Sequence, residues 1–238
     1  MKPLFAFIVL SAFPVSVWPA DDVTPAATYT HAKFVDGKGS LRSLIEFPEV
    51  SGDIRIELMC YGRATALGRL QAGHCSSPDD PDLTFAMAVS RVFNSIRLVP
   101  ATINGKAEEV DFQFTVVFRK ETAANSIEIY LNNQKNVDRL GIDYISAQRF
   151  SPHPLPGRCD GWRQDALIIE AAIVTAEGRA RETNVMSPTD DIRTSCKKGL
   201  LNQLGDARWI PALHQGQYVE SVWVNPIIFS SVPYKREQ

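Results

Sequence analysis

The sequence predicts an α+β protein made of two tandem β-β-α-β modules, each an antiparallel sheet with one helix packed on it. Two observations predict this fold: one stretch of sequence recurs at a fixed spacing, and strand-like and helix-like apolar patterns follow in the same order twice. The 238 residues, 45% of them apolar and 22% charged, suit two small globular domains or one large one.

The recurring stretch covers residues 97–118 and 208–229, which align without a gap and share six identities in 22 positions. The identities are Arg97, Pro100, Ala101, Gly105, Glu109 and Phe118, matched by Arg208, Pro211, Ala212, Gly216, Glu220 and Phe229. Ordinary residue frequencies would give roughly one or two matches. Upstream, Gly62-Arg63-Ala64 and Gly178-Arg179-Ala180 each follow an apolar run. The order and spacing indicate an internal duplication.

The first module is expected over residues 44–119. Alternating apolar residues from Ile54 to Leu58 indicate a half-buried strand, which Tyr61-Gly62-Arg63 is expected to turn back into a weaker strand over 64–70. A helix with apolar positions from Phe85 to Ile96 follows, and Asp80 or Asp82 can cap it.

The first module ends in a third strand. Pro100 stops the helical region, Asn104-Gly105 marks a tight turn, and residues 110–118 alternate as a strand. Residues 120–152 are expected to link the modules, although residues 126–131 alternate like a strand. Residues 21–46 are polar with a few apolar positions and can add a strand to the first module.

The second module is expected over residues 153–230. It repeats the order with a strand over 166–176, a turn at Glu177-Gly178, a helix over 192–204 capped by Asp190 or Asp191, and a strand over 219–229. Pro226 lies inside that last strand and has no N–H to donate. The strand is therefore expected to be an edge strand or to carry a bulge.

Residues 1–20 have the pattern of a secretory signal peptide. Lys2 precedes an apolar run of about 15 residues, and the chain turns polar after Ala20. Cleavage after Ala20 and cleavage near Ala26-Ala27 both fit. A retained anchor is the alternative, but the run is shorter than the ~20 residues of a spanning helix and Pro14 interrupts it. We expect export to the periplasm or a similar compartment.

Four cysteines in an exported chain indicate disulfide bonds, and sequence alone leaves three pairings open. Cys159 precedes the first strand of the second module and Cys196 lies in its helix, so both are expected at one end of that module. Cys60 and Cys75 are expected at opposite ends of their hairpin, about seven residues apart at ~3.3 Å each. A Cys60–Cys75 bond would then require residues 71–82 to fold back over the sheet.

The repeat resembles the C-terminal domain of the TonB family. The resemblance rests on Gly-Arg turns, on Arg208-Trp209-Ile210-Pro211-Ala212 with Gly216, and on Pro226-Ile227-Ile228-Phe229. It covers about 150 of the 238 residues, and the second module matches better. The resemblance implies a sheet edge that accepts a short strand from an outer-membrane receptor, and a link to transmembrane transport. The N-terminal run contains no histidine and no Pro-rich spacer follows it, so this chain departs from an energy transducer.

The expected site residues follow from these patterns. The candidate edge that would accept a partner strand consists of Val222, Val224, Pro226 and Ile228. Eight residues of the repeat signature are expected to be structural: Gly62, Arg97, Pro100, Gly105, Gly178, Arg208, Pro211 and Gly216.

Enzymatic patterns are weak. His74-Cys75 beside Ser76, Ser77 and two aspartates resembles a nucleophile or metal loop, but a disulfide beside a helix-capping loop explains the same residues. The sequence contains no G-x-S-x-G, H-E-x-x-H or P-loop motif, so no catalytic residue, cofactor or metal is expected. A formal net charge of −2 argues against nucleic acid as a partner.

Two functions of different class remain. The first is a non-enzymatic periplasmic protein that binds an envelope protein or an extended peptide at a sheet edge. The alternative is a structural or small-ligand-binding envelope protein whose two modules pack edge to edge.

Overall fold

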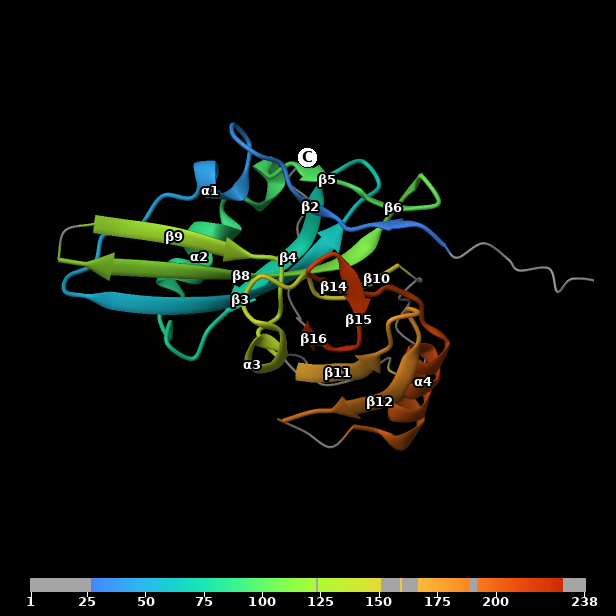
Figure 1. Cartoon of the computed structure of the whole chain (residues 1–238). Coiled ribbons are helices and arrows are strands. Elements are labelled where there is room, and N and C mark those ends of the chain that lie inside the picture. The colour runs from blue at the N-terminus through green and yellow to red at the C-terminus, as the bar shows by residue number, and fades with distance from the viewer. Residues whose placement is uncertain (1–26, 123, 151–158, 160–166, 189–191, 229–238) are drawn as a thin grey trace, which may run out of the picture.

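The computed structural model describes residues 27–122, 124–150, 159, 167–188 and 192–228 (Figure 1). The fold is α+β: a four-stranded antiparallel sheet with helices against it and a three-stranded antiparallel sheet with helix α4 (Thr194–Asp206) against it are joined by short two- and three-residue strands. We call residues 27–150 the first half and residues 167–228 the second half. The expected signal segment and the expected caps Asp190 and Asp191 lie outside the described residues.

The four-stranded sheet has the order β4-β3-β8-β9. Its strands are β3 (Ile54–Ala64), β4 (Leu70–Ser76), β8 (Val110–Glu121) and β9 (Ala124–Tyr130). Helix α2 (Thr84–Ser90) and the 3-10 helix η1 (Phe93–Ser95) contact β4. The central strand β8 is buried from residue 110 to residue 118, because both of its faces are covered. Its alternate phenylalanines pack with Phe34, Phe47 and Phe85 in an aromatic core.

The first hairpin turns later than expected. Strand β3 continues through Gly62, whose φ is not positive, and the turn spans Thr65 to Gly68, where the Gly68 N–H donates to the Thr65 carbonyl at 2.9 Å. Gly68 has a φ of +70° and its carbonyl accepts from Leu98 N. In the second half, Gly178 at +74° donates to Thr175 and accepts from Trp209 in the same way. The counterpart of Gly178 is therefore Gly68, and the predicted match with Gly62 is wrong.

The N-terminal segment contributes short strands to the first half. Strands β1 (Tyr29–Thr30) and β2 (Lys33–Phe34) are followed by helix α1 (Leu41–Leu44). Strand β1 pairs with β6 (Ala101–Ile103), which pairs with β7 (Lys106–Glu108), and β2 pairs with β5 (Leu98–Val99).

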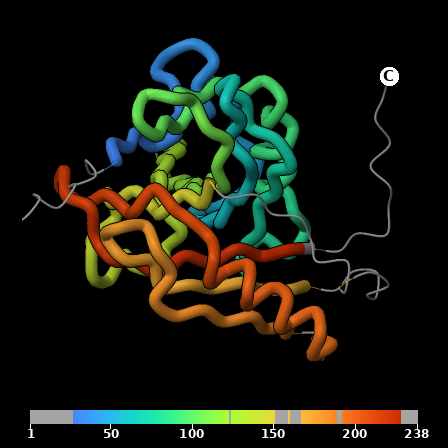
Figure 2. Tube along the Cα trace, turned by 90° about the vertical axis from the view of Figure 1, so that its right-hand side faces the viewer, coloured from blue at the N-terminus to red at the C-terminus, as the bar shows by residue number. Residues whose placement is uncertain are grey.

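The three-stranded sheet of the second half has the order β12-β11-β16. Its strands are β11 (Leu167–Val174), β12 (Ala180–Met186) and β16 (Ser221–Ile228), and helix α4 (Thr194–Asp206) packs on β12. Three short strands precede β16: β13 (Trp209–Ile210), β14 (Ala212–His214) and β15 (Gln217–Val219). Trp209 and Trp223 are fully buried, with ring centroids 5.7 Å apart. In the side view, β16 lies between β11 and the first half (Figure 2).

The segment expected as a linker is folded into the first half and pairs with the second half. Strand β9 lies in the four-stranded sheet, helix α3 (Val137–Leu140) follows it, and β10 (Gln148–Arg149) pairs with β13 of the second half. Ile145 forms a further backbone bridge with Leu213. The halves are therefore connected by backbone pairing as well as by chain continuity.

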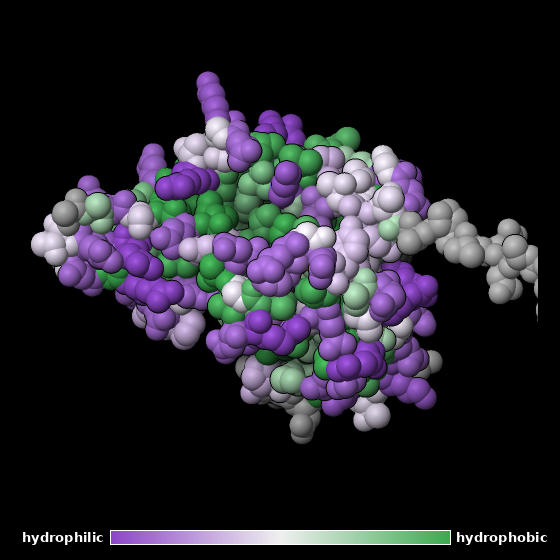
Figure 3. Space-filling model, viewed as in Figure 1, coloured by the Kyte–Doolittle hydropathy of each residue, from purple (hydrophilic) through white to green (hydrophobic). Residues whose placement is uncertain are grey.

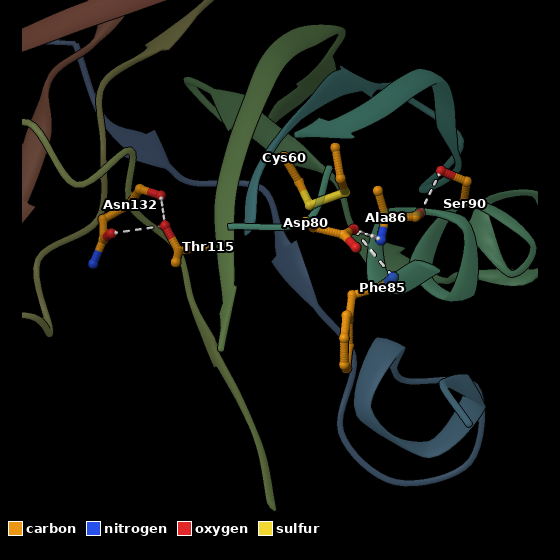
Figure 4. The surroundings of a disulfide bond; sticks show 8 residues. Cys60, Asp80, Phe85, Ala86, Ser90, Thr115 and Asn132 are labelled. Carbon is orange, nitrogen blue, oxygen red and sulfur yellow. Dashed lines mark hydrogen bonds between the residues drawn. A yellow bond between two sulfur atoms is a disulfide. The ribbon is translucent and has the colours of Figure 1, made fainter. Parts of the chain in front are cut away.

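Two disulfides are present, Cys60–Cys75 and Cys159–Cys196. Because the turn lies at residues 65–68, Cys60 and Cys75 stand directly opposite each other on β3 and β4, with Cα atoms 4.1 Å apart. The expected fold-back of residues 71–82 is not needed, so that part of the prediction is wrong. Asp80 lies beside this bond, and its carboxylate accepts from Phe85 N and Ala86 N at the start of α2, as predicted for a cap (Figure 4). Among the described residues no helix is long and apolar enough to cross a membrane.

Candidate functional site

A strand-accepting site requires a sheet edge with unpaired backbone groups, and the two sheets end in four edge strands: β4, β9, β12 and β16. The candidate residues Val222, Val224, Pro226 and Ile228 all lie on β16. Each of the four edges has different surroundings, and these decide which edge can take a partner strand.

The outer edge of β16 is occupied by side chains of the first half. Asn136 accepts from Val222 N through Oδ1 at 2.9 Å and donates to Val222 O through Nδ2 at 3.0 Å. Asn133 Nδ2 also donates to Val222 O, at 3.1 Å, and Gln113 Nε2 donates to Val224 O. These bonds show that the even-numbered residues of β16 direct their backbone groups away from β11.

Like Val222, Pro226 is an even-numbered residue of β16, so its backbone groups also point away from β11. It pairs in register with Ile169 of β11, and its missing N–H falls on the outer side, where the ladder with β11 loses nothing. The outer edge of β16 is thus covered at one end and lacks a donor further along.

Strands β4 and β12 are also poorly suited to accept a strand. In β4, Ala72 has a φ of +49° and the register with β3 shifts, so the edge is bulged. Strand β12 carries the exposed charged residues Arg181 and Glu182. Bulges and charges are common devices that prevent edge pairing.

The outer edge of β9 is regular and open. Strand β8 ends at Glu121 and β9 begins at Ala124, and the pairing of these two residues sets the parity of the hairpin. By this parity Asn125, Ile127 and Ile129 direct their N–H and C=O groups away from β8. No hydrogen bond reaches these outer groups from any described residue. One step past the strand, the Leu131 carbonyl accepts from Ser146 N at 2.8 Å, which agrees with this parity.

Apolar side chains line the open edge. Ile127 and Ile129 are half-buried against the core, and helix α1, which carries Leu44, contacts β9. In the space-filling view hydrophobic side chains gather between β9 and α1, surrounded by hydrophilic ones (Figure 3). The edge therefore offers both backbone hydrogen-bonding groups and apolar surface.

A buried ion pair joins the linking segment to the second half. Arg149 of β10 and Glu170 of β11 are 1% and 0% exposed, and Arg149 Nη1 lies 3.8 Å from Glu170 Oε2. The guanidinium also donates to the Gln203 carbonyl and lies 5.9 Å from the ring centroids of Trp209 and Trp223. Burial lowers the pKa of Arg149, while the carboxylates of Glu170 and Asp111 oppose that shift. An arginine keeps its charge throughout the accessible pH range.

Strand β10 also holds the N-terminal segment. Gln148 accepts from Ala32 N at 2.8 Å and donates to Ala32 O at 3.0 Å. His31 Nε2 lies 2.7 Å from the Pro211 carbonyl, and because a carbonyl can only accept, Nε2 carries the proton. The Gln148 bonds lie within the first half, whereas the His31–Pro211 contact joins the two halves, and a buried hydrogen bond of this kind is worth about 0.5–1.5 kcal/mol.

We expect stability to decrease as the pH falls below about 6.5. Burial lowers the pKa of His31, with an opposing effect of the Pro211 carbonyl, and burial also lowers the pKa of His74. The unfolded chain therefore takes up protons that the folded chain resists, and each site can contribute at most about 1.4 kcal/mol per pH unit. Urea unfolding between pH 7.5 and pH 5 measures the slope, and His31→Gln, which keeps a donor for Pro211, should flatten it. An unchanged slope in this variant would contradict the assignment to His31.

The reactive-looking cluster around His74 and Cys75 contains no thiol, because Cys75 is bonded to Cys60. His74 stacks on Tyr61 with ring centroids 5.5 Å apart, and burial raises the pKa of Tyr61 to about 12. Among the described residues no group of His, Cys, Asp and Glu side chains is arranged to hold a metal ion.

The signature residues lie at turns and strand junctions. Gly105 and Gly216 turn the β6–β7 and β14–β15 hairpins at φ of +78° and +79°. Pro100 and Pro211 separate β5 from β6 and β13 from β14. Arg208 donates to the carbonyls of Asp206 and Ala207 at the end of α4, whereas exposed Arg97 forms a backbone bridge with Arg69.

No protein-family model, no curated protein and no solved structure matches this chain. Sequence reasoning missed the residues that join the halves, above all Asn133, Asn136, Arg149 and Glu170. Asn132-Asn133 has the composition of a loop, and its contact with β16 joins residues 89 positions apart. The one sequence feature that indicates the buried pair is Glu170 itself, a charged residue inside an otherwise apolar strand.

Proposed function

We propose that this chain is a non-enzymatic envelope protein that accepts an extended peptide segment along the outer edge of β9. The observation that carries the proposal is the row of outer backbone groups of Asn125, Ile127 and Ile129, which no described residue pairs. A partner strand would gain hydrogen bonds from these groups and cover the remaining exposed surface of the partly buried isoleucines. This proposal moves the binding edge from β16, where the sequence analysis expected it, to β9.

The resemblance to the TonB C-terminal domain supplies the partner class. It implies an extended segment of an outer-membrane receptor or another envelope protein, in a chain of two related modules exported to the periplasm. The two disulfides fit an oxidising compartment and so support export. The contacts between the halves favour a single binding unit over two independent modules.

The second candidate is a structural or small-ligand-binding envelope protein in which the modules pack together. It is favoured by the side chains of Gln113, Asn133 and Asn136, which cover the β16 edge from the first half. The candidates differ in one property, because only the first requires the β9 edge to bind a strand.

Substitutions on β9 test the proposal. Ile127→Pro removes the outer N–H without breaking the ladder with β8, and Ile127→Ala is the matched control that keeps the N–H but loses the side chain. Random peptides of roughly ten residues, long enough for one strand, serve as the probe in a displayed library. We expect selected peptides to bind Ile127→Pro at least about tenfold more weakly than wild type, a loss of about 1.4 kcal/mol.

Ile127→Ala should weaken binding less than Ile127→Pro, because the backbone ladder remains. Circular dichroism and thermal unfolding check that both variants fold. The proposal is wrong if no library peptide binds, or if the selected peptides bind folded Ile127→Pro as tightly as wild type.

A further inference from the structure

We propose that Gln113, Asn133, Asn136 and Arg139 form an edge cap, which keeps β16 from pairing with β16 of a second copy of this chain. The inference is independent of the binding proposed at β9. It rests on the bonding pattern of the cap, on its position in the repeat, and on the composition of β16.

The bonding pattern of Asn136 imitates a neighbouring strand. Its side-chain amide bonds both Val222 N and Val222 O, at 2.9 and 3.0 Å, as one residue of an adjacent antiparallel strand would. Gln113 donates to Val224 O, and the Arg139 guanidinium donates to Glu220 O just before the strand. The cap therefore uses the groups that a partner strand would need.

The cap is held in place by its own hydrogen bonds. Asn133 and Asn136 are only 2% and 4% exposed. Tyr144 Oη donates to Asn133 Oδ1 at 2.6 Å and accepts from Asn136 Nδ2 at 3.3 Å, while Asn133 Nδ2 donates to Gln113 Oε1 at 2.9 Å. A fully satisfied buried network of this kind fixes its members in one arrangement.

A comparison of the two halves shows which strand of the first half the cap replaces in the second half. Strand β5 starts at Leu98 and β13 at Trp209, β6 at Ala101 and β14 at Ala212, and β8 at Val110 and β16 at Ser221, each pair 111 residues apart. In the first half, β9 lies antiparallel on the outer edge of β8. Among the described residues no strand lies at the corresponding edge of β16, and the cap occupies that place.

The composition of β16 fits a second copy as the occupant that the cap excludes. The strand reads SVWVNPII and carries no charge that would repel an identical strand. Two such strands in antiparallel order present the same donors and acceptors to each other, which gives a closed two-fold pairing. Pro226, which removes one outer donor, limits the same edge.

Light scattering after size-exclusion chromatography, from low to high micromolar concentration, tests the cap. We expect wild type to stay monomeric and Asn136→Ala to form a concentration-dependent dimer. The double variant Asn136→Ala/Val224→Pro lacks the outer N–H of Val224 and should return to a monomer. Asn132→Ala, which removes a buried asparagine that bonds Thr115 rather than β16, is the matched control and should stay monomeric.

A second measurement keeps the test decisive. Amide exchange at Val222 should be slow in wild type and fast in Asn136→Ala at the low concentrations where this variant is monomeric, because Asn136 alone accepts from Val222 N among the described residues. Asn136→Leu, which also removes both bonds to Val222, replaces this variant if Asn136→Ala does not fold. A folded cap variant that stays monomeric while Val222 exchanges freely overturns the proposal. A dimer that persists with Val224→Pro also overturns it, because another surface must then form it.

Discussion

Replacing Arg149 by methionine should destabilise the protein by about 3–5 kcal/mol, because it removes the cation beside a fully buried carboxylate. Glu170 is 0% exposed, and its carboxylate lies 3.8 Å from the guanidinium. The two buried tryptophans that flank Arg149 provide apolar surroundings, which raise the cost of removing one member of a buried charge pair. Urea unfolding followed by tryptophan fluorescence measures the loss.

A double variant separates the ion pair from general damage to the core. Arg149→Met/Glu170→Leu removes both charges and should recover most of the lost stability, since a buried ion pair seldom outperforms well-packed apolar residues. Arg149→Lys keeps the charge but loses the planar group that lies over the tryptophans, so we expect an intermediate loss. A change of less than about 0.5 kcal/mol in Arg149→Met, which is within the range of ordinary surface substitutions, would contradict the account.

Gly178→Ala should cost about 2–5 kcal/mol, the sum of an unfavourable φ and a backbone clash. Gly178 has a φ of +74°, and a Cβ atom there would lie 2.2 Å from the Trp209 carbonyl oxygen. Gly68→Ala should lower the stability by a similar amount, since its Cβ would lie 2.4 Å from the Leu98 carbonyl oxygen.

Gly216→Ala is the matched control for this clash. Gly216 has a φ of +79° but no atom within 4 Å of an added Cβ, so only the backbone strain of about 1–2 kcal/mol applies. Chemical unfolding of the three variants gives the comparison. If Gly178→Ala is no more destabilising than Gly216→Ala, the conclusion that the hairpin turn approaches the β13 backbone closely is wrong.

The α+β class and the element order after each helix could be predicted because local chemistry determines them. Asn104-Gly105 and Gln215-Gly216 turn the backbone at positive φ in both halves, and Pro100 and Pro211 interrupt pairing at equivalent steps. Those residues recur at one spacing, so the repeat is visible in the sequence.

The first hairpin turn could not be located because two glycines compete for it. Gly62 follows an apolar run, as Gly178 does, but β3 passes through it and the turn forms at Gly68. That error placed Cys60 far from Cys75, although the two are direct cross-strand neighbours. Placing the turn six residues too early therefore led to the expectation that a Cys60–Cys75 bond requires residues 71–82 to fold back over the sheet.

The proposed binding edge could not be predicted because its openness depends on contacts between distant residues. The absence of an N–H at Pro226 follows from the sequence, but the parity of β16 and the cover provided by Asn136, 86 residues away, do not. The openness of β9 likewise depends on where α1 and the segment after Tyr130 lie. Long-range polar contacts of this kind leave no periodic signal in the sequence.

Residue-resolved amide hydrogen exchange on the free protein tests the proposed binding edge most directly. The outer N–H groups of Ile127 and Ile129 should exchange rapidly, whereas those of Ser126 and Glu128, which face β8, and of Val222, which Asn136 bonds, should be protected. Addition of a bound peptide should then slow exchange at Ile127 and Ile129 alone among these positions. Protected Ile127 and Ile129 amides in the free protein, together with a rapidly exchanging Val222, would contradict the assignment of the open edge to β9.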